Sequence, residues 1–215
     1  GRIAAICDQN QDTSDIGSDD YALRLKLINQ RENMWSEVTD WPSLFVEYHT
    51  STSLYSGNVT VTLPGDFRKP AGYPQIGSYS YPEIAKSTEG QFGSSDRYVY
   101  YMGTPGYDAC MVVHSGTSTT FLASGESICI PYYRSPASLI SPLNQVMCPN
   151  PDYLVSGTIA DIWESQDDPK YLNKKAEADQ ILANMMEREF TPSEAASNRL
   201  VKTTDQTRHN HRWGK

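Results

Sequence analysis

The spacing of apolar residues changes twice along this chain, and these changes limit the folds that it can adopt. Apolar residues recur at three- and four-residue steps near the start, give way to short strand-like runs, and return to helical spacing near the end. One spacing cannot serve both structures, because strand side chains alternate between two faces while helix side chains repeat about every 3.6 residues. We therefore expect an α+β protein: a small helical bundle, made of an N-terminal helix and a C-terminal helical hairpin, with a long antiparallel β segment inserted between them.

The first helical stretch, with its end, covers residues 21–42. Leu25, Ile28 and Trp35 are among the apolar residues that are spaced for one face of a helix. Pro42 should stop this helix, because proline has no N–H to donate and restrains the residue before it.

Residues 43–150 carry the β signal. They hold 10 of the 14 glycines, 11 of the 14 tyrosines and nine of the 13 prolines, and they lack helical spacing. Apolar or aromatic runs between turn-forming residues predict an antiparallel sheet or a small sandwich. The runs are LFVEYHT, NVTVTL, RYVYYMG, ACMVVHS, TTFLA and SICIPYY. In the second run Val59, Val61 and Leu63 should share a buried face, and Pro64-Gly65-Asp66 should then turn the chain.

Residues 151–190 return to the helical period. A one-sided apolar stripe predicts a helix from Pro151, and Asp168 and Pro169 should begin a second helix that ends near Phe190. The short connection makes these two helices antiparallel, so that they can pack with the first helix as one bundle. The candidate core of the bundle is Leu25, Ile28, Trp35, Ile159, Ile162, Trp163 and Leu182.

Polar arms of opposite charge extend from both ends of this body. Residues 1–20 hold five Asp and one Arg, while residues 191–215 hold five Lys and Arg against two acidic residues. Neither arm can bury enough apolar surface to fold alone, so each should be mobile or bound to a partner. Arginine and tryptophan are common at binding hot spots, and the basic tail carries both. Its candidate partner-binding residues are Arg199, Leu200, Val201, Lys202, Arg208, Arg212 and Trp213.

The overall charge argues against a body that grips nucleic acid. The chain has 18 Lys and Arg against 26 Asp and Glu, a formal charge of -8, whereas phosphate binding depends on clustered cations. No run approaches the roughly 18 apolar residues of a membrane span, and the acidic start lacks the apolar region of a signal peptide. We expect a soluble, unsecreted protein without a membrane partner. Its widely spaced cysteines, Cys7, Cys110, Cys129 and Cys148, predict free thiols in a reducing compartment.

Catalytic motifs are missing from the sequence. It contains no phosphate-binding loop, dinucleotide fingerprint, nucleophile elbow or H-E-x-x-H. His114 and Ser115 could join Asp66 in a hydrolase triad, but adjacent strand residues point to opposite faces. His209 and His211 lack further ligands at metal-binding spacing. We therefore predict no catalytic residue, no cofactor and no metal.

Two further groups of residues have ordinary structural explanations. A helix cap and an exposed helix face account for the carboxylates of Asp167, Asp168, Glu177 and Asp179. Strand tyrosines could form a platform for sugars or bases, although such residues more often lie in a core or an interface. These tyrosines are Tyr79, Tyr81, Tyr98, Tyr100, Tyr101, Tyr132 and Tyr133.

A family resemblance adds to this interpretation. LPGDFRK at 63–69 follows the first helix and a short alternating strand, and it precedes RYVYYMG, YYRSPASL at 132–139 and PDYLVSGTIADIWESQDDPKYLNKKAEAD from 151. LP-x-DF and YYR-x-P are short strings, but their order and spacing over residues 21–190 resemble head-to-tail adaptor proteins of short-tailed double-stranded DNA bacteriophages.

This resemblance implies a structural virion protein without catalysis. Such proteins form a ring, typically dodecameric, in the neck between the portal protein of the capsid and the tail or nozzle protein below. Double-stranded DNA passes through the central channel without specific binding, and the ring is assembled in the cytoplasm of the host bacterium. The basic tail is then expected to dock on the portal, with a clamp on the exiting DNA and an unbound tail as alternatives.

Two other functions compete with a head-to-tail connector. Residues 43–136 could form a carbohydrate-binding or host-adhesion β module of a phage tail that uses the strand tyrosines. Helices on both sides of the β segment argue against a free-standing sugar module. A small hydrolase using His114 or Asp66 has no supporting motif.

Overall fold

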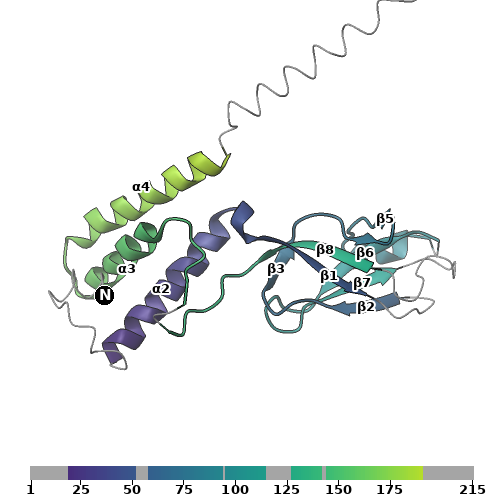
Figure 1. Ribbon diagram of the computed structural model, residues 1–215, viewed down its shortest axis with the longest axis horizontal. Helices are drawn as coiled ribbons and strands as arrows, with labels where there is room; N and C mark the ends of the chain where they lie inside the picture. Colours follow the sequence, from purple (N-terminus) through teal and green to yellow (C-terminus); the bar gives the residue numbers. More distant parts are fainter. Residues whose placement is uncertain (1–18, 52–57, 94, 115–126, 142–143, 191–215) are drawn as a thin grey trace, which may run out of the picture.

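The computed structural model describes residues 19–51, 58–93, 95–114, 127–141 and 144–190. Its helices lie side by side in one lobe and its strands form a second lobe (Figure 1). The α+β class, with antiparallel strands between an N-terminal helix and two C-terminal helices, agrees with the sequence prediction. The acidic arm before residue 19, the run TTFLA and the basic tail lie outside the described residues.

The helical lobe is built from α2 (Asp19–Val38), α3 (Pro151–Ser165) and α4 (Tyr171–Phe190). The chain leaves α2 through a short 3-10 helix, η1 (Pro42–Leu44), so helix α2 ends before the proline as predicted. Asn150 caps α3 by accepting a hydrogen bond from the Asp152 N–H at 3.1 Å.

The turn between α3 and α4 differs slightly from the prediction. Asp168 does cap a turn, since its carboxylate accepts a hydrogen bond from the Lys170 N–H at 2.9 Å. The helix itself begins only at Tyr171, so Pro169 precedes it and does not form its first turn. Asp167, with a φ of 55°, adopts the left-handed conformation that reverses the chain.

Helix α3 is buried on nearly all sides: the predicted apolar stripe is buried or half-buried, but burial is not confined to that side. Tyr153, Ser156, Gly157 and Ala160 are buried together with the apolar stripe. The reason is its position, because α2 packs on one side of α3 and α4 on another (Figure 1). A sequence pattern reports one buried face per helix and does not reveal a second neighbour.

An ion pair crosses from α2 to α3. The Arg31 guanidinium donates to both carboxylate oxygens of Asp161, at 2.7 Å for the Nε–Oδ2 contact. Gly157 permits this crossing, because a Cβ there would lie 3.0 Å from the Arg31 side chain. The absence of a side chain at this position therefore lets the two helices approach.

The candidate core residues divide into two groups. Trp35 and Ile159 have no exposed surface and Ile162 is 9% exposed. The other four, Leu25, Ile28, Trp163 and Leu182, are half-buried. Leu27, not Leu25, packs with Ile28 against the Ile159 and Ile162 cluster. Helices α2 and α4 lie on the outside of the bundle, so their apolar residues are covered on one side only.

The β lobe is a small sandwich of two antiparallel sheets. One sheet has the order β1-β8-β4-β5, with β3 also paired to β8, and the other has the order β2-β7-β6. The strands are β1 (Phe45–Ser51), β2 (Asn58–Thr62), β3 (Phe67–Pro70), β4 (Gln75–Ile76), β5 (Tyr79–Ser80), β6 (Tyr98–Met102), β7 (Cys110–His114) and β8 (Ser127–Arg134). Another 3-10 helix, η2 (Lys86–Gln91), precedes β6.

Both sheets contribute to one core between them. Val61 and Leu63 are buried and Val59 is half-buried in this core, as the alternation predicts. The turn after Leu63 also forms, with the Phe67 N–H donating to the Pro64 carbonyl at 2.9 Å. The short strands β3, β4 and β5 were not predicted, because strands of two to four residues carry too little alternation to be recognised.

The segment that returns from the sandwich to α3 lies along α2. The Asn29 side chain donates to the Leu139 carbonyl at 3.0 Å and accepts from the Leu139 N–H at 2.7 Å. Further along, the Glu32 carboxylate accepts hydrogen bonds from the N–H groups of Met147 and Cys148. The described part of 135–150 thus packs with the helical lobe.

The junction between the lobes is aromatic. Trp35 stacks on Trp41 with ring centroids 5.2 Å apart, and the Trp41 indole N–H donates to the Trp35 carbonyl at 2.8 Å. On the sandwich side, Arg68 donates to the Ser36 carbonyl and Lys69 pairs with Asp40. These contacts fix the end of α2 against the start of the sandwich.

Among the described residues, no helix combines the length and the apolar character that a membrane crossing needs.

Replacing Trp35 by alanine should destabilise the isolated subunit by about 3–5 kcal/mol. The change removes a fully buried indole and leaves Trp41 without the ring on which it stacks. Met34→Ala is the matched control, since Met34 is 44% exposed, and it should cost less than about 1 kcal/mol. Denaturant unfolding measures both changes. Equal costs for the two variants would contradict the packing described for the junction.

Glu32 predicts a pH dependence of stability. Burial raises the pKa of this carboxyl above its ordinary 4.5, although the hydrogen bonds from Met147 and Cys148 oppose the shift. A raised folded-state pKa stabilises the fold below the unfolded pKa and loses that contribution as pH rises through the folded pKa. Glu32→Gln keeps the acceptor and removes the charge, so its free energy of unfolding relative to the wild type should increase as the pH rises above the ordinary pKa of 4.5. A difference that stays constant with pH would contradict this.

Candidate functional site

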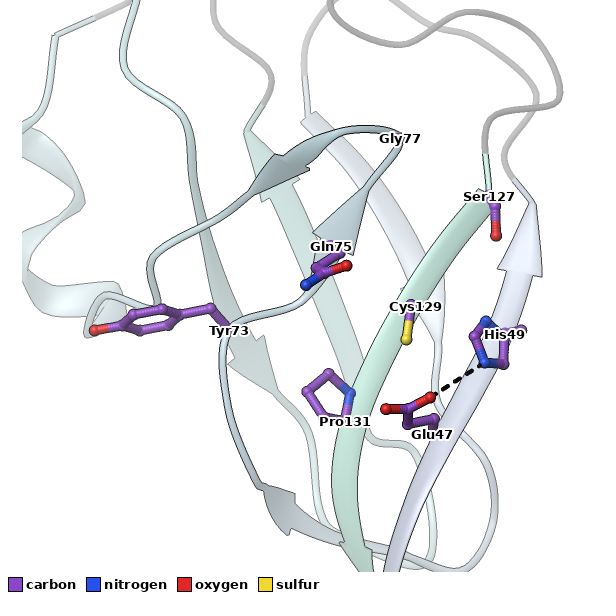
Figure 2. A pocket seen from close by; sticks show the side chains of 8 residues that line it. All are labelled: Glu47, His49, Tyr73, Gln75, Gly77, Ser127, Cys129 and Pro131. Carbon is purple, nitrogen blue, oxygen red and sulfur yellow. Dashed lines mark ion pairs between the residues drawn. The ribbon is translucent and has the colours of Figure 1, made fainter. Parts of the chain in front are cut away.

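A polar depression of about 320 Å³ lies on the outer face of the larger sheet (Figure 2). Strands β1, β4 and β8 supply most of its lining. The lining residues are Glu47, His49, Tyr73, Gln75, Gly77, Ser127, Cys129 and Pro131. Among them are an acid, an imidazole and a thiol, which makes this depression the candidate functional site.

Strand register brings these side chains together. His49 of β1 lies opposite Cys129 of β8, and Gln75 of β4 lies opposite Cys129 on its other side. Paired residues project from the same face of a sheet, so the three side chains form a row across three strands. Glu47 is two residues before His49 and shares that face. The face is the outer one, because Ile128 and Ile130 on either side of Cys129 are buried in the core.

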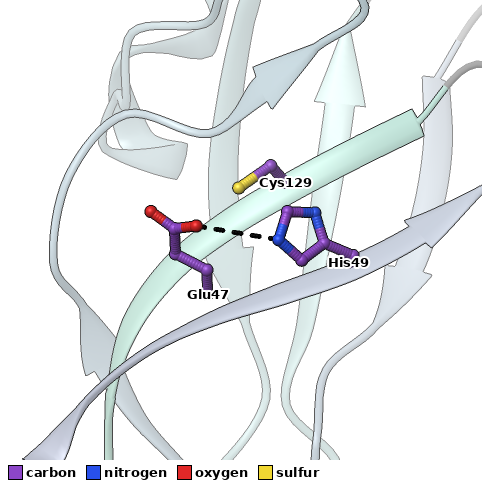
Figure 3. Close-up of side chains that lie close together, drawn as sticks. All are labelled: Glu47, His49 and Cys129. Carbon is purple, nitrogen blue, oxygen red and sulfur yellow. Dashed lines mark ion pairs between the residues drawn. The ribbon is translucent and has the colours of Figure 1, made fainter.

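The carboxylate, imidazole and thiol lie within reach of one another (Figure 3). The ligand atoms of Glu47, His49 and Cys129 are all within 4.8 Å of one another, and Glu47 Oε2 is 3.7 Å from His49 Nε2. The His49 and Glu47 side chains are 61% and 56% exposed, while Cys129 is half-buried. Burial raises the pKa of the Cys129 thiol, and the charge of Glu47 raises it further.

These features favour a binding site over a nucleophile. A catalytic cysteine needs a lowered pKa, whereas the surroundings of Cys129 keep its thiol protonated. Carboxylate, imidazole and thiol are instead the donor types that zinc takes in proteins. Within the part of the chain that the structure describes, these three residues are the group of His, Cys, Asp and Glu placed to hold a metal ion.

The residues considered for a hydrolase are far apart. Asn58 pairs with His114 and Thr62 with Cys110, so the length of β2, about 13 Å, separates His114 from the turn that contains Asp66. His114 stacks on Tyr98 at 4.5 Å, and Asp66 accepts a hydrogen bond from the Tyr132 hydroxyl at 2.8 Å.

The other candidate carboxylates have structural partners or lie on the surface. Asp168 caps the turn before α4, and Glu177 accepts from the Ser156 hydroxyl at 3.0 Å. Asp167 and Asp179 are exposed.

Most strand tyrosines are buried. Tyr81, Tyr98, Tyr100 and Tyr132 are at most 3% exposed, and Tyr101 is half-buried with its pKa raised by burial. Tyr98 and Tyr100 face outward from β6, but the segment before β6 covers them. There Ile84 packs against the cluster of Tyr98, Tyr100 and Val112. The Phe92 ring centroid lies 5.2 Å from that of Tyr98, and the Lys86 Nζ lies 4.3 Å from the Tyr100 ring centroid.

Tyr79 and Tyr133, the other two candidates for a stacking platform, already have aromatic or cationic partners. Tyr79 is 49% exposed, and the Arg97 guanidinium already lies 3.8 Å from its ring centroid. Tyr133 is half-buried and contacts Phe45 edge-on. The rings therefore serve mainly as core and covering layers.

Cys148 differs from Cys129 in its surroundings. It is buried in the helical lobe, where its thiol donates to the Asn150 carbonyl at 3.3 Å and burial raises its pKa to about 11. Cys110 is half-buried at the end of β7, and the thiols of all three described cysteines are free. The wide spacing of the cysteines predicts free thiols, and these three agree with that prediction.

Several sequence candidates lie outside the described residues. They are Cys7, Ser115, Arg199, Leu200, Val201, Lys202, Arg208, His209, His211, Arg212 and Trp213.

Sequence reasoning missed the Glu47, His49 and Cys129 group. Glu47-x-His49 in an alternating strand is a weak signal, since it shows only two donors on one face. The third donor becomes visible only when β1 is paired with β8.

No family model matches the chain, and no curated protein matches it. The function is therefore inferred from the residues and the geometry of the chain itself.

Proposed function

We propose that this protein is a head-to-tail adaptor of a short-tailed double-stranded DNA bacteriophage, a structural subunit of a ring between the portal and the tail. The residue pattern of 21–190 supports the proposal through its resemblance to that family. The observation that carries it is the two-lobed build, with a helical bundle at one end and a β-sandwich inserted at the other (Figure 1). Two different ends suit a subunit that contacts different partners above and below.

An apolar strip on α2 supports the ring. Leu23, Met34 and Val38 are 52%, 44% and 45% exposed. Leu23 and Met34 are about three helical turns apart, and Val38 lies about one turn after Met34. All three side chains therefore lie on the same side of the helix. A closed ring requires a contact between different faces of neighbouring subunits. In this proposal the strip on α2 is one of those faces and a second copy covers it.

Charge supports the proposed route of the genome. The chain carries a formal charge of -8, and a ring of such subunits carries this charge many times over. Acidic walls repel phosphate, so DNA passes through the channel without being held. The adaptor acts here by position and charge, and the proposal assigns it no chemical step.

The basic tail is proposed to dock on the portal. Helix α4 belongs to the helical lobe and ends at Phe190, immediately before the tail begins. The helical lobe is accordingly proposed to face the portal, with the sandwich toward the tail or nozzle protein. Arg199, Lys202, Arg208 and Arg212 provide charge for an acidic groove, and Trp213 provides an apolar anchor.

Native mass spectrometry and negative-stain microscopy test the ring. We expect closed rings with a central hole, formed alone or on portal-bearing capsids. Met34→Glu with Val38→Glu should prevent ring formation without changing the unfolding curve, because charges then face an apolar contact. Asn173→Glu on the exposed face of α4 is the control and should still assemble.

A monomer or a two-fold dimer as the largest species under both conditions would contradict the ring. If that monomer bound glycans, the carbohydrate-binding alternative would replace the adaptor. Assembly of the doubly charged variant with wild-type yield would show that α2 is not the contact face.

Truncation after Phe190 tests the docking of the tail. The shortened chain should keep the unfolding curve of the helical lobe and lose attachment to portal-bearing capsids, because the basic and apolar anchors are gone. Full-length Trp213→Ala should weaken attachment to a smaller degree. Normal attachment of the truncated chain to emptied capsids would contradict docking on the portal. Loss of attachment only when DNA is present would indicate a clamp on the DNA.

A further inference from the structure

We propose that Glu47, His49 and Cys129 bind a divalent transition-metal ion, with zinc as the best match, on the outer face of the β-sandwich (Figure 3). This site is independent of the adaptor proposal, because it rests only on side chains within one subunit. It supplies three protein ligands and leaves a fourth position open.

The backbone holds the three donors in place before any ion arrives. Strands β1 and β8 pair over the whole of β1, from Phe45 with Tyr133 to Ser51 with Ser127. Strand β8 is also paired on its other edge, by β3 and β4, so it lies in the interior of the sheet. A central strand of this kind is more rigid than a loop, and the donors that it carries need little ordering on binding.

The distances suit a tetrahedral ion. Zinc ligands at about 2.0–2.3 Å from the ion lie about 3.3–3.8 Å from one another. The His49 and Glu47 atoms are 3.7 Å apart, and all three donor atoms lie within 4.8 Å of one another. The exposed side chains of Glu47 and His49 can close a difference of about 1 Å by small rotations, without movement of the strands.

The choice of metal follows from the donors. Thiolate and imidazole favour zinc and similar transition metals, whereas calcium and magnesium prefer oxygen ligands alone. When the ion binds, Cys129 releases its proton to solvent water and a thiolate–metal bond forms. The two negative charges of Glu47 and Cys129 then balance the ion, and the repulsion between them is replaced by attraction to the metal.

The depression leaves room for a fourth ligand. Gln75 lies opposite Cys129 on the next strand, and its amide belongs to the lining of the same depression. A water molecule or the Gln75 oxygen can therefore complete the coordination. Solvent access to Glu47 and His49 gives the ion a path to the site.

Cobalt(II) titration of the full-length, chelator-treated protein tests the site. We expect a thiolate-to-cobalt charge-transfer band and visible absorption bands with the intensity typical of tetrahedral cobalt(II). Added zinc should displace the cobalt and remove these bands. Cys129→Ser should abolish the charge-transfer band. His49→Ala and Glu47→Gln should each weaken cobalt binding by more than about tenfold, since even indirect supporting contacts are worth that much at metal sites.

Matched controls separate this site from other thiols and histidines of the chain. Cys110→Ser, which removes the other half-buried thiol, and the double variant His209→Ala with His211→Ala should leave the titration unchanged. Unfolding curves without metal show whether each variant is folded. If Cys129→Ser proves to be destabilised, His49→Ala and Glu47→Gln provide the test instead. The proposal is overturned if the wild type shows no charge-transfer band, if the band survives Cys129→Ser, or if a control variant removes it.

Discussion

The stacked indoles of Trp35 and Trp41 anchor the end of α2 in the core of the helical lobe, at the point where the chain leaves for the sandwich. Both side chains are fully buried, and large aromatic rings contribute more apolar contact area than any other residue type. The stack closes the end of α2 and directs the chain into η1 and then β1. Asp40, with Lys69 and Arg68 across from it, adds charge pairing at the same point. This junction therefore sets the direction in which β1, the first strand of the larger sheet, leaves the helical lobe.

Local patterns were enough to predict the helices but not their surroundings. The ends of α2 and α4 lie close to the prediction, because Pro42 and the charged turn at Asp168 act within a few residues. Burial around α3 was missed, since it depends on the two helices that flank it. The sequence pattern predicts Leu25 in the core in place of its neighbour Leu27 for the same reason: the stripe on α2 is broad enough to allow both, and only the position of α3 decides between them.

Long-range pairing explains what was missed in the β lobe and at the candidate site. The antiparallel sandwich was expected from turn residues and alternation, yet the order of its strands depends on contacts between distant segments. Strand β8 pairs with β1 and also with the short strands β3 and β4, which the sequence did not reveal. From the sequence alone, Cys129 is therefore only one of four widely spaced thiols. In the folded sheet it lies between His49 and Gln75, and this neighbourhood gives it a chemical partner.

The insertion of the sandwich between α2 and α3 has a consequence for the order of folding. The contacts between α2 and α3, such as Arg31 with Asp161, join residues separated by the whole β segment. Closing so long a flexible loop is entropically costly, but a folded sandwich brings the ends of β1 and β8 side by side and shortens the loop that remains. The sandwich should accordingly form before α2 packs on α3, while the α3–α4 hairpin, whose contacts are local, can form independently. Helix α2 is then the last piece to be buried, and until residues 151–190 have been synthesised its apolar face stays open to solvent and to chaperones.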